Sequence, residues 1–404
     1  MSTKEEISGL YNQYVMSTYA PPSLALVKGK GSYVWDSEGK RYLDFLAGIS
    51  VMNVGHCHPK VVKAVRKQAG QLIHVSNLYY NENQPRLAQA LIERSLKGGK
   101  CFFCNSGAEA NEGLIKLARL WGSQQGKYEV ITMRNSFHGR TLATLTATGQ
   151  EKVQKGFHPL PIGFVYADFN NLDSIRSILS DKTAAVLVEA VQGEGGIMPA
   201  TNEFMKGLRA LCDEKNILFL VDEVQAGMGR TGKWFAWQHY GVEPDAFSLA
   251  KALGSGLPMG AVVASPKLAD VFQPGHHATT FGGTPLACAA ALAVVEAIEE
   301  EGMLDNVRKM SDLFRSELEK VAAKYKWIQC VRGCGLMLGL VLDCPAKDLQ
   351  VCLQDQGLLA LATANTIIRF LPPLNIDEKT VKKAVSMIRK ACKVFDKISG
   401  ENKQ

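Results

Sequence analysis

Ile217-Leu218-Phe219-Leu220-Val221-Asp222-Glu223 is an apolar run that ends in two carboxylates. A short continuous run of this kind is typical of a buried strand in a parallel sheet. The next such run along the chain, Ala246 to Leu249, leads into Ala250-Lys251. Ligands of open parallel sheets bind beyond the carboxyl ends of the strands. Asp222 and Lys251 are therefore both expected at the edge of a sheet where a ligand would lie.

Strand-like and helical runs alternate through the middle of the chain. Helical periodicity is seen at residues 108–121 and 203–214. This alternation is typical of a mostly parallel sheet with helices on both faces. The strands expected in that sheet are residues 101–104, 128–133, 163–166, 184–189, 217–222, 246–249 and 260–264. The predicted fold class is α/β, with a large domain built on a seven-stranded, mostly parallel sheet.

The length of 404 residues favours a large domain and a smaller one. The turn-rich residues 24–45 predict a small antiparallel meander. Further elements are expected from helical residues 285–300 and 307–325 and from strand-like residues 336–342 and 367–371. We predict an N-terminal segment (1–50) that joins the small domain, a large domain (51–300) and a small α+β domain (301–404).

The composition argues against several classes of function. With 46% hydrophobic residues and no apolar stretch long enough to span a bilayer, the chain is not expected to bind membranes. The N-terminus resembles no targeting peptide, which predicts a cytoplasmic location, and the ten cysteines form no regular framework and are expected to be reduced. The net charge of +7 is mild, and the basic residues at 382–397 fit an amphipathic helix, so nucleic-acid binding is not expected.

A small-residue turn follows the first predicted strand of the large sheet. Asn105-Ser106-Gly107-Ala108 opens a helix, where free backbone N–H groups and the helix dipole favour an anion. The hydroxyl of Ser106 adds a further donor. This turn is a candidate site for a single phosphate, and the alternative is an ordinary helix N-cap at Ser106.

Four further candidates follow the next strands. Phe137 could cover one face of a planar cofactor, and Arg140 could grip a carboxylate with two parallel hydrogen bonds. Glu189 and Glu194 lie on a glycine-rich rim that includes Gly193. The alternatives are a core position for Phe137, a surface ion pair for Arg140 and solvated carboxylates on the rim.

Asp222 and Lys251 suggest the chemistry. A buried carboxylate at Asp222 requires a cation, and a protonated pyridine nitrogen is such a cation. Gln225, three residues on, could donate to a phenolic oxygen on the same ring. Lys251 lies among small and apolar residues, where desolvation favours the neutral amine that forms an imine with an aldehyde. A lysine at a strand end is more often a surface residue, but the conjunction with Asp222 favours a nucleophile.

The chain resembles the class III, or ornithine/acetylornithine-type, pyridoxal-phosphate-dependent aminotransferases, from Tyr19 to the C-terminal helix. The resemblance rests on Val54-Gly55-His56-Cys57-His58-Pro59, Asn105-Ser106-Gly107-Ala108-Glu109-Ala110-Asn111, Phe137-His138-Gly139-Arg140-Thr141, Asp222-Glu223-Val224-Gln225 with Gly227-Met228-Gly229-Arg230-Thr231-Gly232, Ala250-Lys251-Ala252-Leu253-Gly254 and Thr280-Phe281-Gly282-Gly283. It implies the fold called type I for pyridoxal-phosphate-dependent transferases, and pyridoxal 5'-phosphate as the cofactor.

The resemblance also implies roles for individual residues. Ser106, Gly107 and Ala108 would hold the phosphate, Phe137 would stack on the ring, Asp222 and Gln225 would contact the pyridine, and Lys251 would carry the cofactor as a Schiff base. Thr280 would reach the phosphate bound by a neighbouring subunit, which implies a homodimer with shared active sites.

Two substrates are implied for one pocket. Arg369 matches the arginine that binds the α-carboxylate of glutamate, and Glu194 matches the glutamate that neutralises this arginine when the amino donor has no carboxylate there. Arg140 and Tyr19 would hold the distant carboxylate of the donor, and Glu189 lies on the same rim. The expected donor has an amino group several carbons from a carboxylate, and 2-oxoglutarate is the acceptor.

Within the family, the chain looks most like the members that act on N-acetylornithine in arginine biosynthesis. Ornithine, succinylornithine, acyl-lysine-type and 4-aminobutyrate donors stay open as alternatives. Three departures from the common pattern bear on the donor: Ala190 in place of proline, Thr284 in place of asparagine, and Ala362-Thr363-Ala364-Asn365 before Arg369.

Two alternatives come from other classes of protein. Residues 227–232 fit the G-x-G-x-x-G pattern of a nicotinamide dehydrogenase, with Glu243 and Asp245 further on. The strand ends at Asp222 and does not run directly into the first glycine, which disfavours this interpretation. A metal site could be read from residues 56–58 and 101–104, but neither provides four ligands in paired spacing, so no metal is expected.

Overall fold

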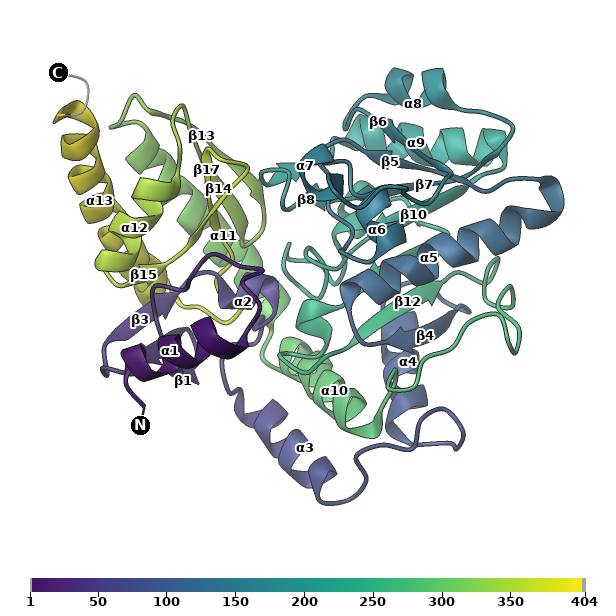
Figure 1. The fold of residues 1–404 in the computed structure, drawn as a ribbon, viewed down its shortest axis with the longest axis horizontal. Helices are drawn as coiled ribbons and strands as arrows, with labels where there is room; N and C mark the ends of the chain where they lie inside the picture. Colours follow the sequence, from purple (N-terminus) through teal and green to yellow (C-terminus); the bar gives the residue numbers. More distant parts are fainter. Residues whose placement is uncertain (1, 402–404) are drawn as a thin grey trace.

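The large sheet lies in one half of the molecule (Figure 1). The computed structural model describes residues 2–401. The strand order of this sheet is β4-β12-β11-β10-β7-β5-β6, with all seven predicted strands present. Their bounds are Lys100–Cys104 (β4), Glu129–Met133 (β5), Phe164–Ala167 (β6), Thr183–Glu189 (β7), Leu218–Asp222 (β10), Ala246–Leu249 (β11) and Gly260–Ala264 (β12).

The register of the central strands brings chemical groups to one edge of the sheet. β10 runs parallel to both β7 and β11, and only β12 is antiparallel to its neighbours within the described sheet. Asp222 lies opposite Glu189 on β7 and opposite Ser248 on β11. Lys251 follows β11 directly. The carboxyl ends of three neighbouring strands therefore present Glu189, Asp222 and Lys251 together, as the sequence predicted for Asp222 and Lys251.

Both faces of the sheet are buried, which explains the continuous apolar runs. On β10, Leu218 and Leu220 join one hydrophobic cluster, and Phe219 and Val221 join the other. The helices associated with this half are α4 (Asn83–Glu93), α5 (Gly107–Gly122), α6 (Leu142–Ala147), α7 (Glu151–Gln154), α8 (Leu172–Ile178), α9 (Asn202–Lys215) and α10 (Pro285–Glu300). Residues between these elements also form the short hairpin of β8 (Val191–Gln192) and β9 (Met198–Pro199) and the 3-10 turns η1 (Ser123–Gln125), η2 (Ala236–Tyr240) and η3 (Lys251–Leu253).

The other half of Figure 1 combines both ends of the chain. One sheet has the order β13-β14-β17-β16, and a second has the order β1-β2-β3-β15. In the second sheet β3 pairs in parallel with β15, so the predicted meander shares a sheet with a C-terminal strand. This pairing supports the predicted grouping of residues 1–50 with the small domain, and the domain limits themselves stay a prediction.

The bounds of the remaining elements complete the fold. The strands are β1 (Leu26–Lys30), β2 (Tyr33–Asp36), β3 (Arg41–Asp44), β13 (Ile328–Cys334), β14 (Met337–Leu342), β15 (Leu358–Leu359), β16 (Leu361–Thr363) and β17 (Ile367–Phe370). The helices are α1 (Lys4–Tyr14), α2 (Ala47–Ser50), α3 (Pro59–Ala69), α11 (Met303–Ala322), α12 (Lys347–Asp355) and α13 (Glu378–Glu401). Across residues 2–401, none of the helices combines the length and the apolar character needed to cross a membrane.

Arg230 ties the two halves together. Its guanidinium is buried and donates to Ser50 Oγ, Asn53 Oδ1 and the carbonyls of Leu336 and Pro372. Ser50 ends the N-terminal segment, Asn53 follows it by three residues, and Leu336 and Pro372 lie in the small domain at the C-terminal end. Burial lowers the pKa of Arg230 to about 9. Four acceptors around one buried cation fix the relative positions of three chain segments.

Candidate active site

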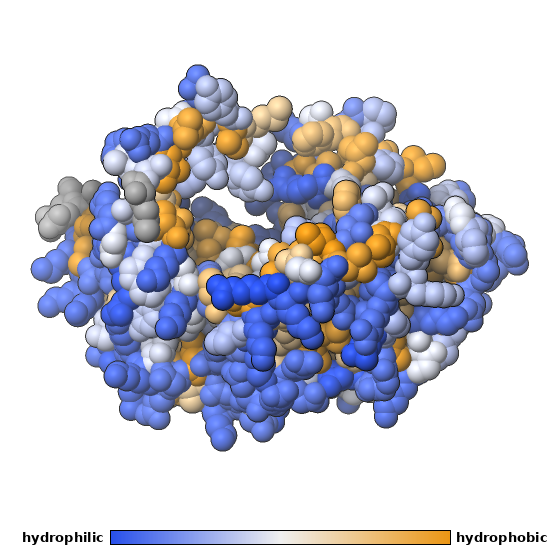
Figure 2. Space-filling view, turned by 90° about the horizontal axis from the view of Figure 1, so that it is seen from below, coloured by the Kyte–Doolittle hydropathy of each residue, from blue (hydrophilic) through white to orange (hydrophobic). Residues whose placement is uncertain are grey.

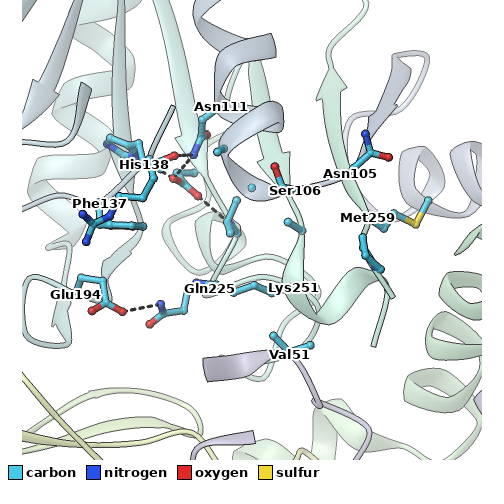
Figure 3. Close-up of a pocket in the computed structure, with 18 of the residues that line it drawn as sticks. Val51, Asn105, Ser106, Asn111, Phe137, His138, Glu194, Gln225, Lys251 and Met259 are labelled. Atoms are coloured by element: carbon cyan, nitrogen blue, oxygen red, sulfur yellow. Dashed lines mark hydrogen bonds and ion pairs between the residues drawn. The ribbon is translucent and has the colours of Figure 1, made fainter. Parts of the chain in front are cut away.

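A cavity of about 430 Å³ opens at the carboxyl ends of the central strands. Figure 3 shows side chains from several elements converging on it. The sequence-predicted residues that line it are Ser106, Gly107, Ala108, Phe137, Arg140, Glu189, Glu194, Asp222, Gln225 and Lys251. Residues that are more than a hundred positions apart in the sequence thus form one site.

Asp222 is held by hydrogen bonds from several elements. Its Oδ2 accepts from Asn111 Nδ2 at 2.7 Å and from His138 Nδ1 at 2.8 Å. Its Oδ1 accepts from the backbone N–H of Val224 at 2.9 Å and from Ser248 Oγ at 3.4 Å. Asp222 is only 4% exposed. These donors fix the orientation of a buried carboxylate.

His138 and Asn111 are site residues that the sequence prediction missed. Burial lowers the pKa of His138, but the hydrogen bond and the charge of Asp222 outweigh this effect and leave the pKa above its ordinary value. His138 Nε2 has no partner within the described part of the chain. Asn111 Nδ2 also donates to the carbonyl of His138 at 2.8 Å. The signal available for His138 was its position directly after Phe137 in the run that follows a predicted strand.

Lys251 lines the same cavity, and its amine forms no hydrogen bond with another described residue. Burial lowers the pKa of Lys251, and the charge of Arg369 acts in the same direction, against the opposite effect of Glu194, Asp222 and Glu189. The backbone φ of Lys251 is +46°, in the left-handed region that residues with side chains rarely adopt. This backbone, a buried amine and a lowered pKa fit a nucleophile better than a surface lysine.

The turn after β4 presents free N–H groups to the cavity. Ser106 is the N-cap of α5, and its hydroxyl accepts from the backbone N–H of Glu109 at 3.1 Å. The backbone N–H groups of Gly107 and Ala108 donate to no other group among the described residues. A Cβ on Gly107 would lie 2.7 Å from Val224 Cγ1, so only glycine fits this wall. The N-cap alternative for Ser106 and an anion site at the same helix end are therefore compatible.

Arg369 does not itself line the cavity, but it forms an ion pair with Glu194, which does. Arg369 Nη1 lies 2.5 Å from Glu194 Oε1 and 3.1 Å from Gln225 Oε1. The Arg369 side chain is 0% exposed, while that of Glu194 is 31% exposed. Burial raises the pKa of Glu194, but Arg369 and Lys251 outweigh it and hold the pKa below its ordinary value. Nε and Nη2 of Arg369 have no partner among the described residues. The guanidinium thus has capacity for a further anionic partner.

Phe137, Arg140 and Glu189 lie close together on the cavity wall. The Arg140 guanidinium lies 5.5 Å from the centre of the Phe137 ring. Glu189 accepts from the backbone N–H groups of Phe137 and Gly193, each at 3.2 Å. Burial raises the pKa of Glu189 to about 7, because these donors and His138 offset only part of the desolvation. Glu189 therefore fixes the backbone around Phe137.

Tyr19 and Thr280 are not brought to this cavity within one chain. Tyr19 is 87% exposed in a segment without regular structure. Thr280 is also exposed and does not line the cavity. Their predicted roles would need the donor or a second subunit, so they stay predictions.

The alternatives from other classes find no support in the geometry. Residues 227–232 lie in consecutive turns after β10, and no α-helix follows them as a dinucleotide-binding fingerprint requires. Within residues 2–401, no group of three or more His, Cys, Asp and Glu side chains is placed to hold a metal ion.

Comparisons with known proteins agree with the site. The chain matches the family described as Aminotransferase class-III over residues 14–392. Acetylornithine aminotransferase of Caldanaerobacter subterraneus is 50% identical over 380 residues, covering 93% of this chain and 96% of the relative. Its counterpart in Methanocaldococcus jannaschii is 50% identical over 392 residues, covering 96% and 98%.

Solved structures extend the comparison to the fold. An ornithine aminotransferase of Toxoplasma gondii, described with partial occupancy of pyridoxal phosphate at its active site, has a TM-score of 0.94 at 33% identity, covering 100% of this chain and 97% of that one. Acetylornithine aminotransferase of Elizabethkingia anophelis has a TM-score of 0.86 at 35% identity, covering 97% and 99%. The fold is thus the type I fold expected from the motifs, and the chain belongs to the class III aminotransferase family.

Proposed function

We propose that the chain transfers the terminal amino group of N2-acetyl-L-ornithine to 2-oxoglutarate, giving N-acetylglutamate 5-semialdehyde and glutamate, a step of arginine biosynthesis. The observation that carries the proposal is the buried Arg369, which is paired with Glu194 and has two further nitrogens, Nε and Nη2, without a partner among the described residues. The names of the curated relatives described above support the same donor.

Class III aminotransferases use pyridoxal 5'-phosphate, and the cavity fits this group. The free N–H groups of Gly107 and Ala108 suit its phosphate, the fixed carboxylate of Asp222 suits its protonated ring nitrogen, and the amine of Lys251 suits its aldehyde. Phe137 lines the same cavity and supplies an aromatic face. When bound, the cofactor supplies an aldehyde that accepts the amino group and a ring that withdraws electrons from the reacting carbon.

Separate residues of the chain have separate roles in the reaction. Asp222 is held in one orientation by hydrogen bonds from Asn111, His138 and the Val224 N–H. Lys251 Nζ, whose pKa burial lowers, can take a proton from the substrate carbon and return it at the next step. Glu189 holds the Phe137 backbone in place. Binding, orientation and proton movement are thus assigned to separate groups.

The pair of Arg369 and Glu194 explains how one pocket takes two unlike substrates. The donor places a terminal amine in the site and no carboxylate near Arg369, so the ion pair stays closed and no buried charge is left alone. The α-carboxylate of glutamate or 2-oxoglutarate can replace Glu194 as the partner of Arg369, and Nε and Nη2, which have no partner among the described residues, can add further hydrogen bonds. Glu194, 31% exposed, can then leave toward solvent.

The charges of the cavity favour an acylated donor over free ornithine. Its lining carboxylates are Glu189, Glu194 and Asp222, and each already accepts hydrogen bonds from the protein. Arg140 offers a cation for the distant carboxylate of the donor. The free α-ammonium of ornithine would find no unengaged carboxylate among these residues, whereas an acylated amine carries no charge that needs one.

We also propose that the protein is a homodimer with shared active sites. Exposed hydrophobic side chains gather in one segment, with Leu78, Tyr79 and Tyr80 each more than 70% exposed, and Phe281 is 62% exposed next to Thr280. Figure 2 shows one face of the molecule on which hydrophobic residues gather beside a central hollow. Exposed apolar patches of this kind are typical of subunit interfaces.

The dimer is tested by light scattering of a Leu78→Asp/Tyr80→Asp variant. We expect a monomer with little activity, because two charges would be buried in the interface. Ile162→Asp, at a side chain that is 78% exposed elsewhere, is the matched control and should stay dimeric. A monomeric wild-type protein with full activity would contradict the proposal.

The donor is tested by the visible spectrum of the purified protein. N-acetylornithine and glutamate, added separately, should each bleach the cofactor band rapidly. Ornithine and 4-aminobutyrate should bleach it at least about tenfold more slowly, which corresponds to about 1.4 kcal/mol. Faster bleaching by ornithine would reassign the donor, and a protein without a visible band after addition of pyridoxal phosphate would contradict the cofactor assignment.

A further inference from the structure

We propose that Arg332 and Thr363 are positioning residues that hold the loop bearing Glu194 against the sheet bearing Arg369, and thereby set the selectivity between the amino donor and glutamate. The inference rests on the proposed function, in which the Glu194–Arg369 pair opens and closes. Neither residue lines the cavity, so both would act through Glu194.

The loop, residues 193–197, has weak internal support. It connects β8 to β9. Its own backbone hydrogen bonds run from Gly196 and Ile197 to the carbonyl of Gly193, both at 3.4 Å. Gly196 and Ile197 have φ values of +100° and +56°, and for Ile197 this conformation is strained. The conformation of the loop must therefore be imposed from outside.

Two side chains of the small domain provide that support. Arg332 Nε, on β13, donates to the carbonyl of Gly196 at 2.8 Å. Thr363 Oγ1, on β16, donates to the carbonyl of Glu194 at 3.3 Å. β13 and β16 belong to the same sheet as β17, which carries Arg369. The loop that supplies the carboxylate is therefore fastened to the sheet that supplies the guanidinium.

The packing at Gly196 shows how tightly the loop is seated. A Cβ there would lie 2.5 Å from Ile367 Cδ1 and 2.7 Å from Arg332 Nη2. The Arg332 guanidinium donates to the carbonyl of Gly196 and forms no ion pair among the described residues, and desolvation lowers its pKa. Burying half of a guanidinium that has no carboxylate partner costs desolvation free energy. The hydrogen bond to Gly196 offsets part of this cost.

The consequence is a bias toward the closed pair. With both hydrogen bonds present, Glu194 is presented to Arg369, which favours a donor that leaves Arg369 unused. When either bond is lost, the loop moves more freely and Glu194 leaves Arg369 more easily. The half-reaction with N-acetylornithine should then slow, while the half-reaction with glutamate should hold or accelerate.

The experiment compares Thr363→Val and Arg332→Gln holoenzymes with wild type. Single-turnover rates with N-acetylornithine and with glutamate give the selectivity as a ratio of kcat/KM values. We expect this ratio to fall about three- to tenfold in each variant, the effect of one hydrogen bond. Amide hydrogen exchange of the peptide containing residues 193–197, without substrate, should accelerate in both.

The matched control is Arg389→Gln. Arg389 lies on α13, pairs with Glu317 and does not bond the loop or β13. It should leave the ratio and the exchange of residues 193–197 unchanged. Thr363→Val is the conservative variant if Arg332→Gln folds poorly.

Two outcomes would overturn the inference and separate it from the function on which it rests. If Glu194→Gln changes the ratio but Thr363→Val and Arg332→Gln change neither ratio nor loop exchange, the support by Arg332 and Thr363 is refuted while the Glu194 switch stands. If Glu194→Gln also leaves the ratio unchanged, the switch itself fails, and the inference fails with it. Equal losses in both half-reactions would indicate only a structural role.

Discussion

Two carboxylates that line the cavity, Asp222 and Glu194, are held in different ways, each by a cluster of neighbouring residues. Asp222 is 4% exposed and accepts hydrogen bonds from Asn111, His138, Val224 and Ser248. At the other cluster, the Glu194 side chain is 31% exposed and accepts from the side chains of Arg369 and Gln225. Both oxygens of Asp222 are engaged, and the unpartnered atoms of the first cluster are Asn111 Oδ1 and His138 Nε2, whereas the second cluster keeps unpartnered donors on the cation itself, Arg369.

This difference corresponds to the lifetimes of the two partners. A group that stays bound through the whole reaction needs a carboxylate that does not move, and several donors from different elements fix Asp222. A substrate that binds in only one of the two half-reactions needs a cation that can exchange one carboxylate partner for another. An ion pair with spare donors and a partly exposed partner meets that need.

The largest expected effect comes from Lys251, which lies between the clusters and serves both half-reactions. Lys251→Ala should lower turnover by about 10⁵-fold or more, because no other described amine lines the cavity to replace it. Circular dichroism and light scattering should show an unchanged fold and assembly. Steady-state activity near that of wild type would remove Lys251 from the mechanism.

Loss of charge at the rigid cluster should be smaller and uniform. Asp222→Asn leaves a neutral side chain at the same place and should slow both half-reactions by about 10²–10³-fold, since a fixed charge acts on every reacting species. The two half-reactions are measured separately by stopped-flow absorbance. An effect confined to one of them would break the distinction between the two clusters.

Loss of charge at the exchangeable cluster should be smaller again and one-sided. Glu194→Gln leaves Arg369 without its counter-charge when the donor is bound, so the half-reaction with N-acetylornithine should fall by about tenfold or more. The half-reaction with glutamate should change by less than about threefold, because the α-carboxylate takes the place of Glu194. The ratio of the two kcat/KM values is the measurement, and a ratio equal to that of wild type would refute the switch.

The smallest expected effect is on stability as a function of pH. The pKa of Glu194 is held below its ordinary value of 4.5, so the stabilisation by this carboxylate is complete above that pH and is lost as the pH falls through the lower, folded value. The difference in melting temperature between Glu194→Gln and wild type should be constant above about pH 5.5, where the carboxylate is ionised in both states, and should shrink in acid.

Glu189 provides the opposite case for the same measurement. Its pKa is raised from 4.5 to about 7, so wild type should lose stability relative to Glu189→Gln as the pH rises through this interval. The same sign of pH dependence for both variants would contradict these two assignments.

The fold could be predicted where local pattern and burial agree. All seven strands of the large sheet were expected because their apolar runs are continuous, and residues 285–300 were expected as the helix that the structure shows. β13 was not predicted, because residues such as Gln329, Arg332 and Gly333 give it no apolar periodicity. Its pairing with β14 depends on tertiary contacts that the local sequence does not encode.

The candidate site divides in the same manner. Residues that follow strands, such as Asp222 and Lys251, could be placed from the chain alone. Asn111 could not, because it is an interior residue of α5 whose side chain meets Asp222 only after the helix packs on the sheet. The hydrogen bond from Arg369 to Gln225 could not be predicted either, because the two residues are far apart in the sequence and meet only in the folded chain.

Strand β3 leaves the ribosome long before its partner β15 exists. Leu43 pairs with Leu358, so roughly 300 residues are added between them, which takes about 15–60 s at about 5–20 residues per second. During that time the open edge of the N-terminal sheet can pair with other chains, a risk that the shortness of β3 and the charge of Arg41 reduce. The N-terminal sheet is therefore complete only when synthesis is nearly finished. Chains that end before β15 keep an open strand edge and should aggregate.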